Sequence, residues 1–405
     1  MINIAVLGYG VVGSGVVEVL NLNGEGIAKR CGQEIQVKYV LDLRDFPGDP
    51  IQDKIVHDFN IIANDPSVSI VVEVMGGTEP AYTFVKASLE KGKSVCTSNK
   101  ELVAKHGAEL LKISKKNNVN FLFEASVGGG IPIIRPLNQS LTADEIEEIT
   151  GILNGTTNYV LSKMSDEGID FETALKQAQA LGYAERNPEA DIKGFDSCRK
   201  IAILSSLAFG MQVDFEDIHT EGITEISHID IKYAKSLGAT IKLLGTSKKV
   251  GDKVYAMVAP MLMKPNHPLF SVNNVFNGIF VRGNMIGDVM FYGSGAGKLP
   301  TASAVVADVV DAAKHIGTNI MQIWSRRKLE LSDKNDASHR FFIRLGQSGA
   351  ELETKVQEEF GSVTKVEAEG VQNEYAFITE SISEKEYEEK IKKFVDVKNM
   401  IRVMF

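Results

Sequence analysis

The chain has 405 residues, of which 44% are hydrophobic and 24% charged, and its formal net charge is −9. This length predicts two or three domains, and the acidic balance argues against a nucleic-acid partner, because phosphate binding requires a basic surface. No apolar run reaches the roughly 18 residues of a membrane span, and three widely spaced cysteines, with an N-terminus that leads straight into a strand, favour a reduced cytoplasmic setting without a signal peptide.

The first predicted element is a short apolar strand, Ile4 to Leu7, which opens directly into a glycine-rich turn with the spacing GxGxxG. Gly8 permits the tight turn, Gly10 lets the backbone approach a pyrophosphate, and Gly13 lets the following helix pack closely on the strand. The pyrophosphate would bind the free N–H groups at the helix N-terminus. Because strand, turn and helix follow in this order, we predict a dinucleotide site rather than a structural turn.

A second strand, Ile35 to Leu41, follows after an extension over residues 21–32. It ends at Asp42, and Arg44 stands two residues further on. An acidic residue at this place usually accepts a ribose hydroxyl of NAD, whereas a nearby arginine can hold the 2′-phosphate of NADP. The choice between NAD and NADP is therefore open at this point.

Strands and helices alternate up to residue 124, with further strands over 69–74, 94–97 and 119–123. This alternation predicts a parallel sheet wound on both sides, of the Rossmann type. Ligands of such sheets bind beyond the carboxyl ends of the strands. We expect one crevice there, lined by the residues that follow the strand ends, namely Gly8, Gly76, Lys100 and Glu124.

The regular alternation of strands and helices ends at about residue 131. A strand is then expected over 146–153, followed by a helix that begins at Asn154. A loop over 182–188 leads into a long helix, expected from Ile192 to Phe209, and several strands follow up to residue 292. This predicts an α+β domain. A second glycine-rich turn then precedes a helix over 300–316 that can return to the first domain, and residues 326–338 are expected to be a linker.

The last 65 residues have a pattern of their own. The order strand, helix, strand, strand, helix, strand predicts a ferredoxin-like domain. It is either structural or regulatory. The expected domains are 1–130 with 298–325 for dinucleotide binding, 131–297 as the α+β domain, and 339–405 as the structural or regulatory domain.

Asp196 and Lys200 are four residues apart on the long helix and so share one of its faces. The simplest interpretation is a surface ion pair, but the turns around them are nearly all apolar, and a buried ion pair is costly unless it has a function. Glu185 and Asp191 in the preceding loop can add carboxylates. A lysine can donate a proton to a carbonyl oxygen, and carboxylates can bind a substrate ammonium group, so we expect a dehydrogenase acting on an amino-acid alcohol or aldehyde.

Two other features are weaker. Cys96 lies within a predicted strand and is expected in the core rather than in a site. Glu124 stands before a glycine-rich bend over 127–131, whose carbonyls suit a hard cation, although a simple turn fits equally well.

Several motifs resemble homoserine dehydrogenase over essentially the whole chain. They are GYGVVG at 8–13, TSNKELVA at 97–104, EASVGGGIPII at 124–134, GILNGTTNY at 151–159, LGYAERNPEADIKGFDSCRK at 181–200 and GSGAGKLPTASAVVAD at 293–308. The family reduces L-aspartate 4-semialdehyde to L-homoserine with NAD(P)H, on the route to threonine and methionine. The resemblance implies an oligomer, a dimer or tetramer formed through the middle domain.

The resemblance also implies roles for single residues. Lys200 would be the proton donor, Lys100 would assist beside the nicotinamide, and Glu185 and Asp196 would hold the substrate with Asp191 close by. The implied coenzyme contacts, with the two outer glycines of the first turn, are Gly8, Gly10, Val11, Val12, Gly13, Lys100, Gly182 and Gly297. A sodium ion would be bound by Glu124 with the carbonyls of Val127, Gly129 and Ile131.

Two departures from the family pattern matter. Leu41 stands where many relatives have arginine, which makes NAD plausible beside NADP. The tail resembles an ACT domain, but the turn after its first strand is Gly346-Gln347-Ser348-Gly349, so an amino-acid effector such as threonine and a merely oligomerising tail are rival hypotheses. Two rivals for the whole chain are a phosphorylating semialdehyde dehydrogenase, which would need Cys198 as nucleophile, and a catalytically inactive nucleotide-sensing protein.

Overall fold

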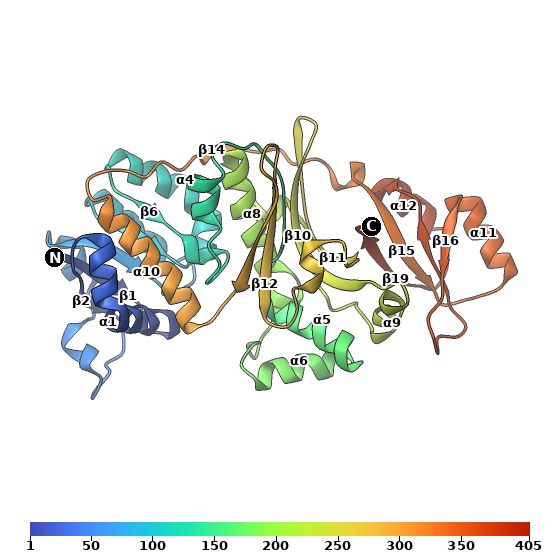
Figure 1. Cartoon of the computed structure of the whole chain (residues 1–405), viewed down its shortest axis with the longest axis horizontal. Helices are drawn as coiled ribbons and strands as arrows, with labels where there is room; N and C mark the ends of the chain where they lie inside the picture. Colours follow the sequence, from blue (N-terminus) through green and yellow to red (C-terminus); the bar gives the residue numbers. More distant parts are fainter. The chain divides into compact units, whose positions relative to one another are not determined.

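The computed structural model describes all 405 residues, which divide into two compact units (Figure 1). Unit 1 comprises Met1–Glu145, Ala202–Phe215 and Gly293–Leu329, and unit 2 comprises Ile146–Ile201, Glu216–Tyr292 and Glu330–Phe405. None of the helices is both long and apolar enough to cross a lipid bilayer.

Unit 1 contains a six-stranded parallel sheet with the order β3-β2-β1-β4-β5-β6. The strands are β1 (Ile2–Leu7), β2 (Ile35–Leu41), β3 (Ile55–Val56), β4 (Val68–Glu73), β5 (Ser94–Thr97) and β6 (Phe121–Leu122). The helices are α1 (Val11–Cys31), α2 (Phe59–Asn64), α3 (Ala81–Glu90), α4 (Lys100–Lys116) and α10 (Lys298–Lys314). This strand order is that of a dinucleotide-binding fold, which confirms the Rossmann prediction.

Helix α10 packs against α1, although it lies far away in the sequence (Figure 1). The close approach depends on Gly15, where a Cβ would lie 2.9 Å from the carbonyl oxygen of Lys298 and 3.0 Å from the Cβ of Ala302. The expected return of this helix to the first domain is thus confirmed. The extension expected over 21–32 is the second half of α1, which ends only where Gly32 adopts a left-handed conformation, with φ 79°.

The expected linker over 326–338 is partly wrong. Its beginning forms β14 (Ser325–Lys328), which pairs in parallel with β8 (Met211–Gln212). Trp324 explains the ordering of this segment, because its ring is buried and its Nε1–H donates to Gln212 Oε1 at 3.0 Å. A buried tryptophan with a satisfied N–H fixes the chain on either side of it.

Unit 2 is built on an eleven-stranded mixed sheet with the order β13-β12-β7-β10-β11-β19-β15-β17-β16, to which β9 and β18 are added at β11 and β15. Strands outside the tail are β7 (Ile146–Ile152), β9 (His219–Thr220), β10 (Thr240–Val250), β11 (Lys253–Met263), β12 (Phe276–Gly283) and β13 (Gly287–Ser294). Helices are α5 (Gly155–Glu167), α6 (Phe171–Ala180), α7 (Glu189–Ile192), α9 (His228–Ser236) and the first part of α8 (Phe195–Phe209), which from Ala202 on belongs to unit 1. The long helix expected from Ile192 is interrupted, because Gly194 has φ 83° and separates α7 from α8.

The tail has the predicted order of elements with one short strand added. It consists of β15 (Ser338–Leu345), α11 (Ala350–Phe360), β16 (Val363–Val366), β17 (Tyr375–Thr379), β18 (Ile382–Ser383), α12 (Glu384–Ile391) and β19 (Val397–Val403). The order β19-β15-β17-β16 with antiparallel pairing is that of a ferredoxin-like sheet. Its edge strand β19 pairs in parallel with β11, with Met261 opposite Arg402, so the tail continues the sheet of unit 2 (Figure 1).

Candidate active site

The residues predicted for the site fall into two sets, one in each unit. In unit 1, β1 ends at Leu7 and α1 begins at Val11, with the glycine turn between them. Gly8 has φ 98°, and a Cβ at Gly13 would overlap the carbonyl oxygen of Gly8, so neither position accepts another residue without strain. The N-terminus of α1 is capped by no side chain. Its N–H groups and the helix dipole therefore suit an anion such as a pyrophosphate.

Asp42 at the end of β2 is tied to this turn. Its Oδ2 accepts the N–H of Tyr9 at 2.8 Å. Its two oxygens also accept hydrogen bonds of 3.0 Å from Nε and Nη2 of Arg44, which is itself mostly exposed. The Arg44 guanidinium, against the opposing effect of burial, holds the pKa of Asp42 well below its usual range. A carboxylate and a guanidinium thus lie side by side where the ribose of a dinucleotide would be bound.

A buried carboxylate, Glu73, organises the next strand ends. Its Oε2 accepts the Thr97 hydroxyl at 2.6 Å and its Oε1 accepts the N–H of Met75 at 2.8 Å. Thr97 Oγ1 in turn accepts the N–H of Asn99 at 2.9 Å, and Asn99 caps α4 by accepting from Leu102 N at 3.1 Å. Lys100, which is half-buried, is the first residue of that helix. The network therefore holds the start of α4, and with it Lys100, at the carboxyl end of the sheet.

The bend after β6 is closed by its own acidic residue. The Glu124 carboxylate accepts the backbone N–H groups of Ile133, Ile134 and Arg135 at 2.6, 2.8 and 2.7 Å. Asp308 on α10 accepts the N–H of Glu124 at 2.8 Å and the guanidinium of Arg135 at 2.6 Å. The carboxylate of Glu124 is thus committed to closing the bend, and a cation at this place would contact its carbonyl oxygen.

In unit 2, three buried side chains and the half-buried Asp191 form a cluster at the start of α8. Nζ of Lys200 lies 2.9 Å from Oδ2 of Asp196 and donates to the carbonyl oxygen of Leu153 at 2.7 Å. Asn154, which follows β7 and caps α5, donates through Nδ2 to Oδ1 of Asp191 and to Oδ2 of Asp196, both at 2.8 Å. Burial, followed by the neighbouring charge of Asp196, raises the pKa of Asp191. The structure thus brings together Lys200, Asp196 and Asp191, as predicted.

The other predicted residues lie outside this cluster. Glu185 is exposed in the loop between α6 and α7, and Gly182 precedes it in that loop with φ 74°. Gly297, with φ 123°, is the cap of α10 and belongs to unit 1. Val11 and Val12 are the first two residues of α1.

Comparison with known proteins places this architecture in a family. Residues 132–310 match the family model described as "Homoserine dehydrogenase", and residues 8–124 match "Homoserine dehydrogenase, NAD binding domain". A homoserine dehydrogenase of Bacillus subtilis is 38% identical over 375 residues, which are 90% of this chain and 84% of the relative. The chain belongs to the homoserine dehydrogenase family.

Solved structures agree with this assignment. A crystal structure of a homoserine dehydrogenase from Thiobacillus denitrificans has a TM-score of 0.92 at 34% identity, with 99% of this chain and 98% of that chain covered. A hyperthermophilic archaeal homoserine dehydrogenase in complex with NADPH has a TM-score of 0.66 at 30% identity, with 77% and 97% covered. The chain is therefore an NAD(P)-dependent oxidoreductase of amino-acid biosynthesis that interconverts L-homoserine and L-aspartate 4-semialdehyde.

The cysteines do not support the phosphorylating rival. Cys198 is buried on α8, and burial raises the pKa of its thiol. Cys96 is fully buried within β5, as expected, and burial raises its pKa well above the usual value. Reactive cysteines need a stabilised thiolate, so neither position suits a nucleophile.

Asn154, Glu73, Thr97 and Asn99 were not predicted as part of the site. Asn154 links two carboxylates that lie 37 and 42 residues away in the sequence, so nothing in the local pattern indicates the contact. The position of Asn154 in the sequence could have indicated its role, because a polar residue that follows a buried strand lies at the edge of the sheet where ligands bind. The same holds for Thr97, the last residue of β5, and for Asn99 two residues further on.

Proposed function

We propose that Lys200 transfers the proton of the homoserine dehydrogenase reaction. In the direction of reduction it donates a proton from Nζ to the aldehyde oxygen, and in the direction of oxidation it accepts the hydroxyl proton. NAD(P)H, when bound, supplies the hydride to the aldehyde carbon. The observation that carries this proposal is the placement of Nζ, which Asp196 and the Leu153 carbonyl hold at 2.9 and 2.7 Å. Two of its N–H bonds are directed by these acceptors, and the third can point to a substrate oxygen.

The carboxylates divide the remaining tasks. Asp196 keeps the Lys200 ammonium oriented, and Asp191 with Asp196 binds the polar end of the substrate, because two carboxylates bridged by one amide present a negative surface to an ammonium group. We assign Glu185 to the substrate ammonium as well, from the exposed loop that follows α6.

On the coenzyme side, the fit of the residues supports a pyrophosphate on the turn formed by Gly8, Gly10, Val11, Val12 and Gly13, since the helix N-terminus is uncapped and the glycines leave room for a close approach. Lys100 assists beside the nicotinamide from the start of α4, and Gly182 and Gly297 complete the coenzyme contacts. We further propose that both coenzymes are accepted, because Asp42 can receive a ribose hydroxyl and Arg44 can pair with a 2′-phosphate.

A sodium ion fits the bend of residues 124–131 through carbonyl oxygens of Glu124, Val127, Gly129 and Ile131. Gly129 has φ 58°, a conformation that turns successive carbonyls of a short loop in different directions.

We also propose a role for each domain. Residues 1–130 with 298–325 bind the coenzyme, and residues 131–297 catalyse the reaction and form a homodimer or homotetramer. The ACT-like tail, residues 339–405, binds an amino-acid effector such as threonine.

The test is absorbance at 340 nm with homoserine and either NAD or NADP, for the wild type and Lys200→Ala. The matched control is Lys163→Ala, because Lys163 and Glu167 form an ion pair with the same four-residue spacing on a more exposed face of α5. Loss of a positioned proton carrier costs about 10²- to 10⁴-fold in rate, so we expect that loss for Lys200→Ala and a change below about twofold for the control. Wild-type turnover that survives in Lys200→Ala would overturn the assigned role, and no turnover with either coenzyme would favour the nucleotide-sensing rival.

A further inference from the structure

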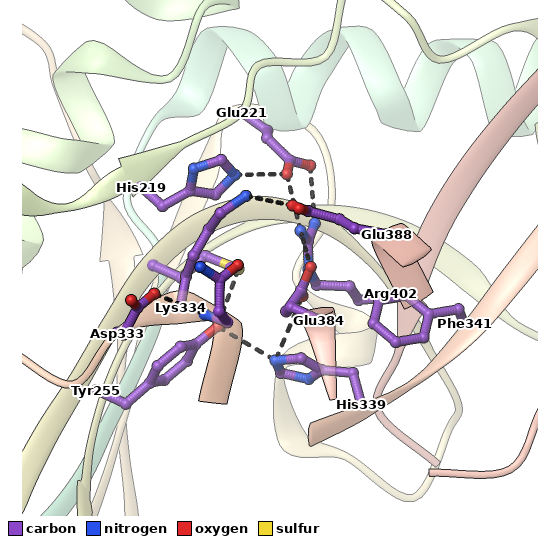
Figure 2. A network of polar contacts seen from close by, with 12 residues as sticks. His219, Glu221, Tyr255, Asp333, Lys334, His339, Phe341, Glu384, Glu388 and Arg402 are labelled. Atoms are coloured by element: carbon purple, nitrogen blue, oxygen red, sulfur yellow. Dashed lines mark hydrogen bonds and ion pairs between the residues drawn. The ribbon is translucent and has the colours of Figure 1, made fainter. Parts of the chain in front are cut away.

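The last strand of the tail carries a buried arginine that joins it to the rest of unit 2. Arg402 on β19 is only 2% exposed and lies between two carboxylates (Figure 2). Its Nη1 and Nη2 donate to Glu221 at 2.8 Å each, and its Nε and Nη2 donate to Glu384 of α12 at 2.5 and 3.0 Å. A guanidinium that donates two hydrogen bonds to a carboxylate on each side fixes the position of both carboxylates.

Glu221 is the partner on the catalytic side of this link. It directly follows β9, and His219 at the start of that strand places Nε2 2.7 Å from its Oε1 (Figure 2). Although burial alone would raise it, hydrogen bonds from His219 and Arg402 bring the pKa of Glu221 down to about 2. The Glu221 backbone N–H donates to the Val258 carbonyl at 2.7 Å, so this residue is held by both its side chain and its main chain.

The segment after Glu221 contacts the substrate loop backbone to backbone; we define this loop as residues 181–194, between α6 and α8, and it includes the short helix α7. Ile223 N–H donates to the carbonyl oxygen of Ile192 at 2.8 Å. Two glycines allow the approach: a Cβ at Gly222 would overlap that same carbonyl, and a Cβ at Gly194 would lie 3.1 Å from the Glu221 carbonyl oxygen. A shift of Glu221 is therefore transmitted to the chain around Ile192.

This part of the loop carries one of the substrate carboxylates. Asp191 precedes Ile192 directly, and through Asn154 it is connected to Asp196 and so to Lys200. Gly194 N–H also donates to the Asp191 carbonyl at 2.9 Å. The path from Arg402 to Asp191 thus consists of hydrogen bonds and close backbone contacts without a gap.

We infer that Arg402 and Glu221 are positioning residues for the homoserine dehydrogenase reaction: the tail, through this ion pair, sets the position of Asp191 in the substrate loop and hence the affinity for homoserine. The inference rests on the proposed role of the Asp191, Asp196 and Lys200 cluster. Under this inference the tail affects substrate binding through these hydrogen bonds, independently of any effector that binds to the tail.

The test compares Glu221→Gln with Glu384→Gln. Each removes one of the two charges that Arg402 contacts and leaves the other, but only Glu221 touches the chain next to the substrate loop. Couplings of this kind amount to about two- to thirtyfold in affinity, so we expect Glu221→Gln to raise the KM for homoserine at least about threefold with the KM for the coenzyme unchanged. Glu384→Gln should lower the melting temperature about as much as Glu221→Gln does. It should leave the KM for homoserine and the KM for the coenzyme within about twofold of the wild type.

Equal KM values in the two variants, with comparable losses of melting temperature, would overturn the inference, because the link would then only stabilise the fold. If Glu221→Gln does not fold, Arg402→Lys takes its place, since it keeps the charge but loses the fork. The result is separable from the proposed function: a Lys200→Ala variant without activity beside an unchanged KM in Glu221→Gln contradicts the positioning role alone.

Discussion

The two units present their ligand sides in opposite ways. In unit 1 the surface proposed for the coenzyme is mainly backbone, a glycine turn and an uncapped helix N-terminus, with side chains such as Glu73 packed behind it. In unit 2 the surface is made of side chains, two carboxylates and a lysine joined by one asparagine. A backbone site depends on the absence of side-chain atoms, whereas a side-chain cluster depends on a balance of charges. Different substitutions should therefore disrupt binding at the backbone site of unit 1 and at the side-chain cluster of unit 2.

The largest effect is expected from a charge placed within the cluster of unit 2. Asn154→Asp keeps the cap of α5, because aspartate caps helices as well as asparagine does, but it exchanges the amide donor for a third carboxylate beside Asp191 and Asp196. An uncompensated buried charge costs about 3–5 kcal/mol, so kcat/KM for homoserine should fall by at least about 100-fold.

Asn154→Ser is the control for that variant, since it also caps α5 but adds no charge. It should lose clearly less activity than Asn154→Asp, with the two proteins equally helical by circular dichroism. If both lose the same amount, the bridge rather than the charge balance governs the cluster.

Which of these features could be predicted from the sequence depends on how local they are. The glycine turn is a pattern over six residues, and Asp196 with Lys200 is a pattern over five, so both could be predicted, and the structure has the turn before α1 and the ion pair on α8. The interruption at Gly194 has a local signal that the apolar pattern of α8 obscured. The pairing of β19 with β11 has no local signal in the sequence, because it joins strands that lie far apart along the chain. It is accompanied by the ion pairs of Arg402 with Glu221 and Glu384.

The next effect breaks the backbone site of unit 1. A Cβ at Gly13 overlaps the Gly8 carbonyl, so Gly13→Ala must move α1 away from the end of β1. Overpacking of this kind costs about 1–3 kcal/mol, and the KM for the coenzyme should rise while the KM for homoserine changes little. Fluorescence titration with NADPH and urea unfolding measure the two losses.

Gly26→Ala on the same helix is the matched control for Gly13→Ala. Nothing lies within 4 Å of a Cβ at Gly26, which is exposed on α1. Replacing an exposed helical glycine by alanine stabilises a helix by about 0.5–1 kcal/mol. The two substitutions should therefore change the free energy of unfolding in opposite directions, and the same sign for both would show that the contact at Gly8 does not constrain the turn.

The smallest effect concerns Asp308, a buried carboxyl group in unit 1 that contacts Glu124 and Arg135 and is expected to matter for the fold rather than for the ligand. Burial, followed by the nearby charge of Glu124, raises the pKa of Asp308 to about 7 from its ordinary value. Because the folded-state pKa is the higher one, the folded protein binds this proton more tightly than the unfolded chain does. The stabilisation is complete below the unfolded pKa and is lost as the pH rises through about 7. Between about pH 6 and pH 8 the wild type should lose about 1 kcal/mol relative to Asp308→Asn, which has no proton to release. Urea unfolding at both pH values measures this difference, and parallel pH dependence of the two proteins would mean that Asp308 does not titrate in this range.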